Sequence, residues 1–201
     1  MSRNPRTLAA YEAAADLYAE QTLATPSAPL LAFIDSLVEM VPAAATVLEI
    51  GSATGRDAAL FEARGLRVCR TDATQAFVSR MRADGHPAQL LNVLTDDLGV
   101  GWDLLYASAV FLHFSVTELT QVLAKAAGAV LPGGLLAFTV KQGSGAAWST
   151  AKLGRPRHFT YWREPALRAL IDASAWQAVS IEQVAGANED WLYSICRRPA
   201  S

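Results

Sequence analysis

Cysteine, histidine and charged residues are all scarce in this chain. Its 201 residues include 2 Cys and 3 His, and Asp, Glu, Lys and Arg together make up 18%. The two cysteines, Cys69 and Cys196, are far apart in the sequence and do not resemble the disulfide framework of a small secreted domain. Because the histidines and cysteines show no metal-ligand spacing, we expect no metal site.

The net charge is equally small, which bears on possible partners. The formal charge is −2 and the isoelectric point is about 5.9. The largest basic clusters are Arg3 with Arg6 and Arg197 with Arg198. The chain therefore lacks the basic face that is typical of nucleic-acid-binding domains, and we expect no nucleic acid partner. The composition gives no indication of the oligomeric state.

Long apolar runs are missing as well. No stretch approaches the roughly 20 apolar residues that a membrane-spanning helix needs. The N-terminal segment MSRNPRTLAAYEAAADLYAE is charged and amphipathic, without the continuous apolar block of a signal peptide. We therefore expect a cytoplasmic protein with no membrane partner.

Apolar residues are nevertheless abundant. They make up 52% of the sequence, and the mean hydropathy is +0.19. This is enough to build a substantial core within one domain. Apolar side chains at three- and four-residue steps predict amphipathic helices over 8–22 and 30–41. We expect a single domain over 1–201, with a helical cap over 1–42 and a core over 43–201.

Strands and helices then alternate. The expected strands are 46–50, 66–71, 88–93, 102–107, 135–140, 178–184 and 191–196, and the expected helices are 57–64, 74–83, 116–131 and 164–175. Segment 141–157 contains three glycines and is expected to be an exposed loop. The last two strands are joined too closely for a parallel crossover, so they form a hairpin. The fold class is α/β, with a doubly wound, mostly parallel sheet of seven strands and a C-terminal antiparallel hairpin.

The most informative motif is VLEIGSATGRDA, residues 47–58. An apolar strand runs into Glu49, and Gly51 and Gly55 then bracket a turn before the next helix. Glycines at such a turn let a ligand approach the main chain, and the helix N-terminus favours an anionic group. Asp72 follows the second strand, where a carboxylate can accept hydrogen bonds from a ribose diol. Asn92 follows the third strand and could hold an adenine ring.

Two other interpretations of this motif remain open. A nicotinamide dinucleotide would also use Asp72, but its fingerprint G-x-G-x-x-G is absent, because Gly51, Ala53 and Gly55 follow a different spacing. A purely structural interpretation makes the glycines a tight turn and Asp72 a cap of the next helix.

The chain resembles the class I S-adenosylmethionine-dependent methyltransferases over nearly its whole length. The residues that carry this resemblance are EIGSATG after the first strand, Asp72, Asn92, WDLLYASAVFLHF, LPGGLLAF and the N-terminal YEAAADLYAE. The family usually has glycine where Ala53 stands and Asp where Asn92 stands. The resemblance implies a Rossmann-like fold, S-adenosylmethionine as cofactor and S-adenosylhomocysteine as product. The cofactor-binding residues it implies are Tyr18, Glu49, Gly51, Ser52, Ala53, Gly55, Asp72, Ala73, Asn92, Val93 and Ala107.

Methyl transfer to a hydroxyl benefits from a general base, and His113 is the best candidate because it follows the fourth strand closely. The alternative is that His113 packs at the sheet edge with its ring bonded to the backbone. His158, Tyr161 and Trp162 are candidates for the acceptor pocket; the alternative is that His158 is a loop or helix-start residue and that the two aromatic residues pack against the sheet.

The sequence thus predicts a methyltransferase that acts on a small-molecule acceptor. One alternative is an RNA or protein methyltransferase. Another is a non-catalytic nucleoside-binding module or a nicotinamide oxidoreductase. The sequence identifies neither the acceptor nor the atom that is methylated.

Overall fold

The computed structural model describes residues 3–22 and 24–200, and it is built on one seven-stranded sheet. The strand order is β3-β2-β1-β4-β5-β9-β8. The bounds of these strands are β1 (Thr46–Ile50), β2 (Arg67–Asp72), β3 (Ala88–Leu90), β4 (Trp102–Ala107), β5 (Val130–Lys141), β8 (Gln177–Val184) and β9 (Trp191–Arg197). β9 pairs antiparallel with both β5 and β8, whereas β1, β2, β3, β4 and β5 pair in parallel. The predicted fold class is confirmed, with the antiparallel strand one position in from the edge.

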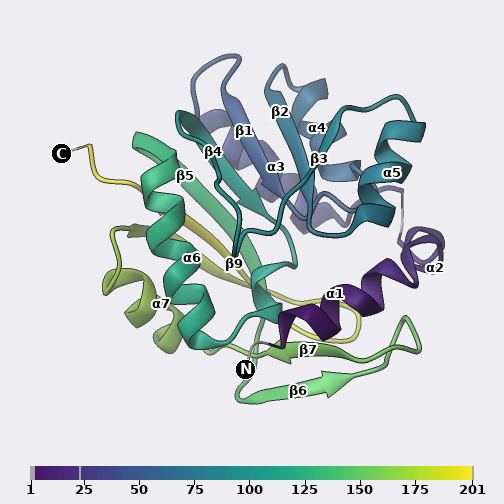
Figure 1. Ribbon diagram of the computed structural model, residues 1–201. Helices are drawn as coiled ribbons and strands as arrows, with labels where there is room; N and C mark the ends of the chain where they lie inside the picture. The colour runs from purple at the N-terminus through teal and green to yellow at the C-terminus, as the bar shows by residue number, and fades with distance from the viewer. Residues whose placement is uncertain (1–2, 23, 201) are drawn as a thin grey trace.

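Helices cover both faces of this sheet. α6 (Val116–Ala129) and α7 (Glu164–Asp172) lie in front of it in Figure 1, and α3 (Ala28–Met40) and α4 (Arg56–Ala63) lie behind it. α5 (Gln75–Ala83) packs beside β2 and β3. Val47, Leu48 and Ile50 of β1 are all buried, because a parallel strand covered on both faces needs apolar side chains on both. Within the described part of the chain, no helix is long and apolar enough to cross a membrane.

The parallel register brings the carboxyl ends of β1, β2 and β4 to the same edge of the sheet. Leu48 pairs with Cys69 of β2 and with Leu105 of β4. The turns that follow these three strands therefore lie side by side. This edge, at the point where the strand order reverses, is where ligands bind in open α/β sheets.

The first segment of the chain forms two helices, so the expectation of one helix over 8–22 is wrong. α1 (Asn4–Glu12) and α2 (Ala15–Glu20) are separated at Ala14, whose φ is −139°. Alanine does not break a helix by itself, so the reason lies in the tertiary structure. The Glu12 carboxylate accepts hydrogen bonds from the backbone N–H of Ala76, in the first turn of α5, at 3.1 and 3.3 Å.

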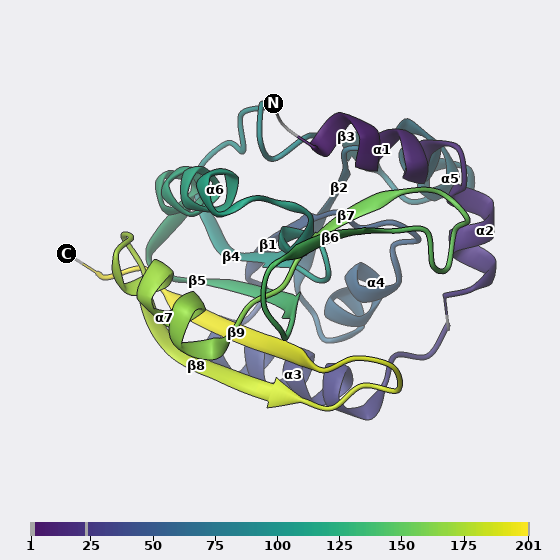
Figure 2. The same ribbon diagram turned by 90° about the horizontal axis from the view of Figure 1, so that it is seen from below.

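The position of these helices is the part of the fold that matters most for function. α1 lies across the carboxyl ends of the strands, between α5 and the strand β7 (Arg157–Thr160) (Figures 1 and 2). In contrast, α3 packs into the core behind the sheet, where Ile34 and Leu37 are fully buried. Of the segment 1–42, therefore, α1 and α2 cover the edge of the sheet and α3 covers its face.

Segment 141–157 is not a simple exposed loop, as the glycines had suggested. It contains β6 (Ala146–Ser149), which pairs antiparallel with β7 (Arg157–Thr160). β6 is largely exposed and β7 is fully buried. The hairpin passes beneath α1 in Figure 1. The short 3₁₀ helix η1 (Phe111–His113) also contacts β7. The glycines of this segment therefore allow a hairpin that covers the sheet edge.

Candidate functional site

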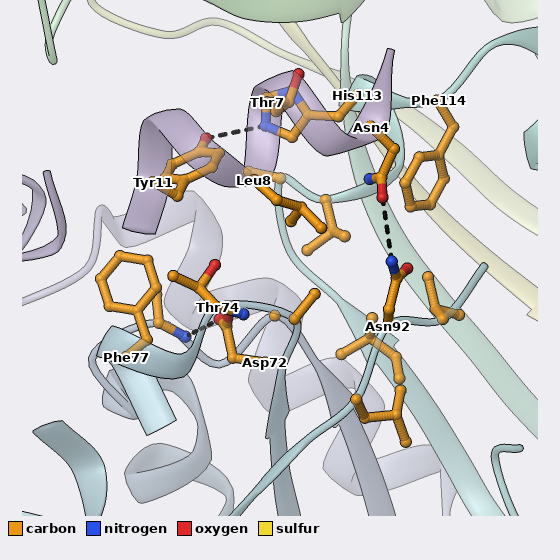
Figure 3. A pocket seen from close by; sticks show the side chains of 18 of the residues that line it. Asn4, Thr7, Leu8, Tyr11, Asp72, Thr74, Phe77, Asn92, His113 and Phe114 are labelled. Atoms are coloured by element: carbon orange, nitrogen blue, oxygen red, sulfur yellow. Dashed lines mark hydrogen bonds between the residues drawn. The ribbon is translucent and has the colours of Figure 1, made fainter. Parts of the chain in front are cut away.

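Two adjoining cavities open at the carboxyl ends of β1, β2 and β4. The first, here called the Asp72 cavity, is drawn in Figure 3, and its wall includes Asn4, Thr7, Tyr11, Tyr18, Gly51, Ala53, Asp72, Ala73, Thr74, Asn92, Val93, Ser108, Val110, His113 and Phe114. The second, the Glu49 cavity, is lined by Tyr18, Thr22, Ser27, Glu49, Gly51, Ser52, Ala53, Thr54, Arg56, Asp57, Ser108 and Lys152, among others. Tyr18, Gly51, Ala53 and Ser108 belong to both walls. The two cavities therefore meet at the turn after β1.

That turn has an alternating left-handed backbone. The φ angles of Gly51, Ala53 and Gly55 are 71°, 50° and 74°. A Cβ on Gly51 would lie 2.5 Å from Cγ2 of Val110, so glycine is required there by close approach as well as by conformation. Ala53 takes the same region with a side chain, which costs an L-residue roughly 1–2 kcal/mol. The sequence marked both positions, but only the close approach of Val110 shows that Gly51 has no room for a side chain.

Asp72 fastens this turn to the end of β2. Its carboxylate accepts hydrogen bonds from Ala53 N–H at 3.0 Å and from Thr74 N–H at 2.8 Å. Asp72 is 6% exposed, and burial raises the pKa of its carboxyl. Its contact with Thr74 at the start of α5 agrees with the structural interpretation. Each carboxylate oxygen can nevertheless accept a further hydrogen bond, so the group also has capacity for a ligand in the cavity.

Glu49 is a buried acid on the wall of the second cavity. Its side chain is 3% exposed, and Oε2 has no hydrogen-bond partner. Burial raises the pKa of Glu49 to about 8, with a further contribution from the nearby negative charge of Asp57. A buried carboxyl with an unused oxygen is poised to receive a positively charged ligand group, whose charge would favour the ionised form of Glu49.

The remaining predicted cofactor residues divide into two groups. Ala73, Asn92 and Val93 line the Asp72 cavity and Ser52 lines the Glu49 cavity. The Asn92 amide donates to the side-chain oxygen of Asn4 at 3.1 Å, which links α1 to the floor of the site (Figure 3). Ala107 and Gly55 line neither cavity. Ala107 is fully buried in β4, and the wall is formed by the residues that follow it, 108–110.

Tyr18, one of the predicted cofactor-binding residues, lines both cavities, and a second tyrosine contacts His113. The hydroxyl of Tyr11 is 2.9 Å from Nε2 of His113 (Figure 3). The rings of Tyr11 and Tyr18 meet edge to face, with their centroids 5.7 Å apart. In the sequence, Tyr11 belongs to the apolar stripe and to the motif YEAAADLYAE, and neither assigns it a role at the site. Its spacing of two helical turns from Tyr18 was the available signal.

His113 faces the Asp72 cavity and is held from behind. Its Nδ1 is 2.6 Å from the backbone carbonyl oxygen of His158. A carbonyl oxygen can only accept, so Nδ1 carries the proton and the lone pair lies on Nε2, where it accepts from the Tyr11 hydroxyl. His113 is 6% exposed, and burial lowers its pKa to about 3. Both earlier interpretations therefore describe part of its geometry: the ring is bonded to the backbone, and it also faces the cavity.

The three residues predicted for the acceptor pocket line neither cavity. Trp162 is buried in the main core cluster, and Tyr161 packs against that cluster. His158 is buried behind His113, and its backbone N–H donates to Thr7 Oγ1 at 3.1 Å. Its Nε2 is 3.1 Å from a guanidinium nitrogen of Arg3. His158 thus orients His113 and joins β7 to α1, and the aromatic residues after it support the core.

The site contains no candidate metal centre within residues 3–22 and 24–200. No three His, Cys, Asp or Glu side chains gather there in an arrangement that could hold an ion. Cys69 is half-buried and Cys196 is buried, and both are free thiols. The arrangement suits a ligand with a diol or similar polar group near Asp72 and a cationic group near Glu49.

Comparison with known proteins agrees with this geometry. Residues 48–138, which run from β1 to β5, match a family described as a methyltransferase domain. No curated protein matches the chain by sequence.

Several solved structures share the fold over almost the whole chain. One is 1,6-didemethyltoxoflavin-N1-methyltransferase of Burkholderia thailandensis, with bound 1,6-didemethyltoxoflavin and S-adenosylhomocysteine. It is 18% identical, with a TM-score of 0.78 and coverage of 99% of this chain and 91% of that one. DhpI in complex with S-adenosylhomocysteine is 20% identical, with a TM-score of 0.79 and coverage of 98% and 97%. The CcbJ methyltransferase of Streptomyces caelestis is 17% identical, with a TM-score of 0.73 and coverage of 92% and 96%. At these identities the likeness is one of fold.

Proposed function

We propose that this chain, whose residues 48–138 match a methyltransferase domain, transfers the methyl group of S-adenosylmethionine to a small-molecule acceptor. The observation that carries this proposal is the pair of buried carboxyls at the turn after β1. Asp72 lies on one side of the turn, and Glu49, with an unused Oε2, lies on the other. The similar proteins with bound S-adenosylhomocysteine support the same cofactor.

The residues fit this cofactor better than a nicotinamide dinucleotide. The ammonium of the methionine portion would pair with Glu49, which otherwise keeps a buried carboxyl oxygen without a partner. Asp72 would accept hydrogen bonds from the ribose hydroxyls, and Asn92 and Val93 would flank the adenine. A dinucleotide would instead bring a phosphate to this turn, next to Glu49, and would offer no cation to pair with that carboxyl.

The chemistry that the cofactor supplies is an electrophilic methyl group on a positively charged sulfur. The protein's own contribution is alignment and the exclusion of water. α1 forms part of the wall of the Asp72 cavity, and the β6–β7 hairpin supports α1 through bonds such as that between Thr7 Oγ1 and His158 N–H. A cavity bordered in this way suits a small acceptor, as in the Burkholderia thailandensis relative crystallised with 1,6-didemethyltoxoflavin.

His113 is proposed to orient the acceptor. Because its pKa is about 3, the imidazole is neutral at physiological pH, and Nε2 offers a lone pair toward the cavity. The Tyr11 hydroxyl now donates to that lone pair. We propose that the O–H or N–H of the acceptor takes the place of this hydroxyl and donates to Nε2, which fixes its lone pair toward the methyl group. A base with so low a pKa holds a proton only transiently, so His113 directs the acceptor more than it stores charge.

Titration calorimetry tests the cofactor assignment. The protein is titrated with S-adenosylhomocysteine and, separately, with NAD. Saturable binding of the sulfur nucleoside with no response to NAD supports the proposal. Binding of NAD with no response to S-adenosylhomocysteine would replace it by an oxidoreductase.

The acceptor class is tested with S-adenosylmethionine that carries a labelled methyl group. The protein is incubated with a cell extract that has been separated into a small-molecule filtrate and a macromolecular fraction. Label that enters the filtrate supports a small-molecule acceptor. Label found only in the macromolecular fraction would assign the acceptor to RNA or protein.

A further inference from the structure

Arg157, the first residue of β7, is a buried cation without a matching anion. Its side chain is 6% exposed, and no Asp or Glu of the described residues forms an ion pair with it. Arg70 illustrates the usual arrangement, because it is equally buried but forms a two-pronged pair with Glu62 at 2.6 and 2.7 Å. Buried charges are rarely left uncompensated, since removal from water is costly.

The contacts of the Arg157 guanidinium satisfy only part of its hydrogen-bonding capacity. Nη1 donates to the Tyr11 hydroxyl at 3.1 Å, and Nη2 donates to the carbonyl oxygen of Ala151. Nε is buried and has no partner. The guanidinium also lies 5.4 Å from the ring centroid of Tyr11 and 5.1 Å from that of Phe159. None of these groups carries a negative charge.

A second cation from the same hairpin, Lys152, is exposed, unlike Arg157. Lys152 lines the Glu49 cavity, and its Nζ lies 3.9 Å from the ring centroid of Tyr18 and donates to Thr22 Oγ1 at 3.1 Å. Among the residues that the structure describes, no carboxylate pairs with it either. Burial lowers the pKa of Lys152, and the positive charges of Arg157 and Arg56 lower it further. The hairpin therefore directs two mutually repelling cations toward one region.

This region borders the place where we expect the acceptor. Tyr11 and Tyr18 are both on the wall of the Asp72 cavity, and each is in contact with one of the two cations. Tyr11 also reaches His113 (Figure 3). Arg157 is thus one hydrogen bond behind the cavity wall, next to the group proposed to orient the acceptor.

We propose that the acceptor carries an oxyanion, of the carboxylate or phosphate type, which Arg157 and Lys152 hold beside Tyr11 and His113. This inference rests on the proposed methyltransferase function. It explains why the hairpin buries an arginine without a carboxylate: the missing negative charge arrives with the ligand. It also gives the β6–β7 hairpin a role in selecting the acceptor.

The same chemistry could have another source, since the cofactor has a carboxylate of its own. The two sources are distinguished by which ligand loses affinity when Arg157 is replaced. If the acceptor provides the oxyanion, loss of Arg157 leaves affinity for S-adenosylhomocysteine unchanged and weakens only a second, anionic ligand. If the cofactor provides it, affinity for S-adenosylhomocysteine falls instead.

The experiment uses inorganic phosphate and acetate as probes. Protein saturated with S-adenosylhomocysteine is titrated with each anion by calorimetry, in a buffer without chloride. We expect one anion site in the unaltered protein, at least tenfold weaker binding in Arg157→Met, and several-fold weaker binding in Lys152→Met. Arg155→Met is the matched control, because Arg155 is an exposed cation in the same hairpin turn, and it should bind as the unaltered protein does.

Three results would overturn the inference. They are an absence of anion binding to the unaltered loaded protein, equal anion binding by Arg157→Met and Arg155→Met, and a loss of S-adenosylhomocysteine affinity in Arg157→Met as large as the loss of anion affinity. If Arg157→Met does not fold, Lys152→Met decides, since it should bind the anion several-fold more weakly than Arg155→Met, and equal binding by these two variants would overturn the inference. Failure of the unaltered protein to bind S-adenosylhomocysteine at all would refute the proposed function itself.

Discussion

Replacing Glu49 by glutamine changes one carboxyl that the structure buries without a partner for Oε2. Glutamine has nearly the same shape and stays neutral at every pH. If the ammonium of the ligand pairs with Glu49, the ionised carboxylate is the binding form and the protonated carboxyl is not. Binding must then release a proton from Glu49, and the variant must lose that release.

The magnitude follows from the pKa of about 8 in the ligand-free protein. Such a carboxyl is about 90% protonated at pH 7, so ligand binding releases about 0.9 proton at that pH. Affinity for S-adenosylhomocysteine should rise about tenfold per pH unit from pH 5 to 7 and level off above pH 8. In the ligand-free protein, the contribution of Glu49 to folding stability changes in the opposite direction and falls as the pH rises. A raised pKa favours the folded state most below about pH 4.5, and this contribution is lost as the pH rises through about 8.

Calorimetry in several buffers with different heats of ionisation counts the released protons directly. The unaltered protein should show a binding enthalpy that varies with the buffer, and Glu49→Gln should not. Glu39→Gln is the matched control, because Glu39 is an exposed acid on α3 that lines neither cavity. It should behave as the unaltered protein does.

The reasoning about Glu49 is refuted if the unaltered protein releases less than about 0.3 proton at pH 7. It is equally refuted if Glu49→Gln binds as tightly as the unaltered protein at pH 8. Either result would mean that the buried carboxyl does not meet a cationic group of the ligand.

Other substitutions test the rest of the site. Asp72→Asn should weaken S-adenosylhomocysteine binding by about 1.5–3 kcal/mol, the scale of a charged hydrogen bond left unmade, and an unchanged dissociation constant would show that Asp72 is not on the ribose. His113→Ala should reduce turnover with an identified acceptor while cofactor affinity stays the same; unaltered turnover would make His113 structural. In urea unfolding, Gly51→Ala should lose about 1–3 kcal/mol, because its Cβ would lie 2.5 Å from a methyl of Val110. Ala53→Gly should change stability by less than about 1 kcal/mol, since relief of left-handed strain is offset by the entropy of glycine, and a loss as large as that of Gly51→Ala would contradict this account.

Much of the sheet and of the turn after β1 could be predicted from local sequence. β1 and β4 have the predicted bounds, because each is a short apolar run between breakers. Glu49, Gly51 and Asp72 were identified because they follow strands whose carboxyl ends must meet in a parallel sheet. Periodicity fails where helix or strand is decided by distant partners. The break at Ala14 depends on Glu12 meeting α5, and β6 exists only through its pairing with β7.

The sequence by itself therefore determined most of the main sheet, the turn after β1 and the positions of Glu49 and Asp72. These features depend on apolar patterns and turn residues that are close together along the chain. Only the tertiary structure decided how α1 and the β6–β7 hairpin are placed at the site. Tyr11 meets His113 across 102 residues and Arg157 across 146, and no local pattern encodes such contacts. They arise because α1 and the β6–β7 hairpin close on the same edge of the sheet, which buries Arg157 and His113 together and leaves the charge of Arg157 unmatched.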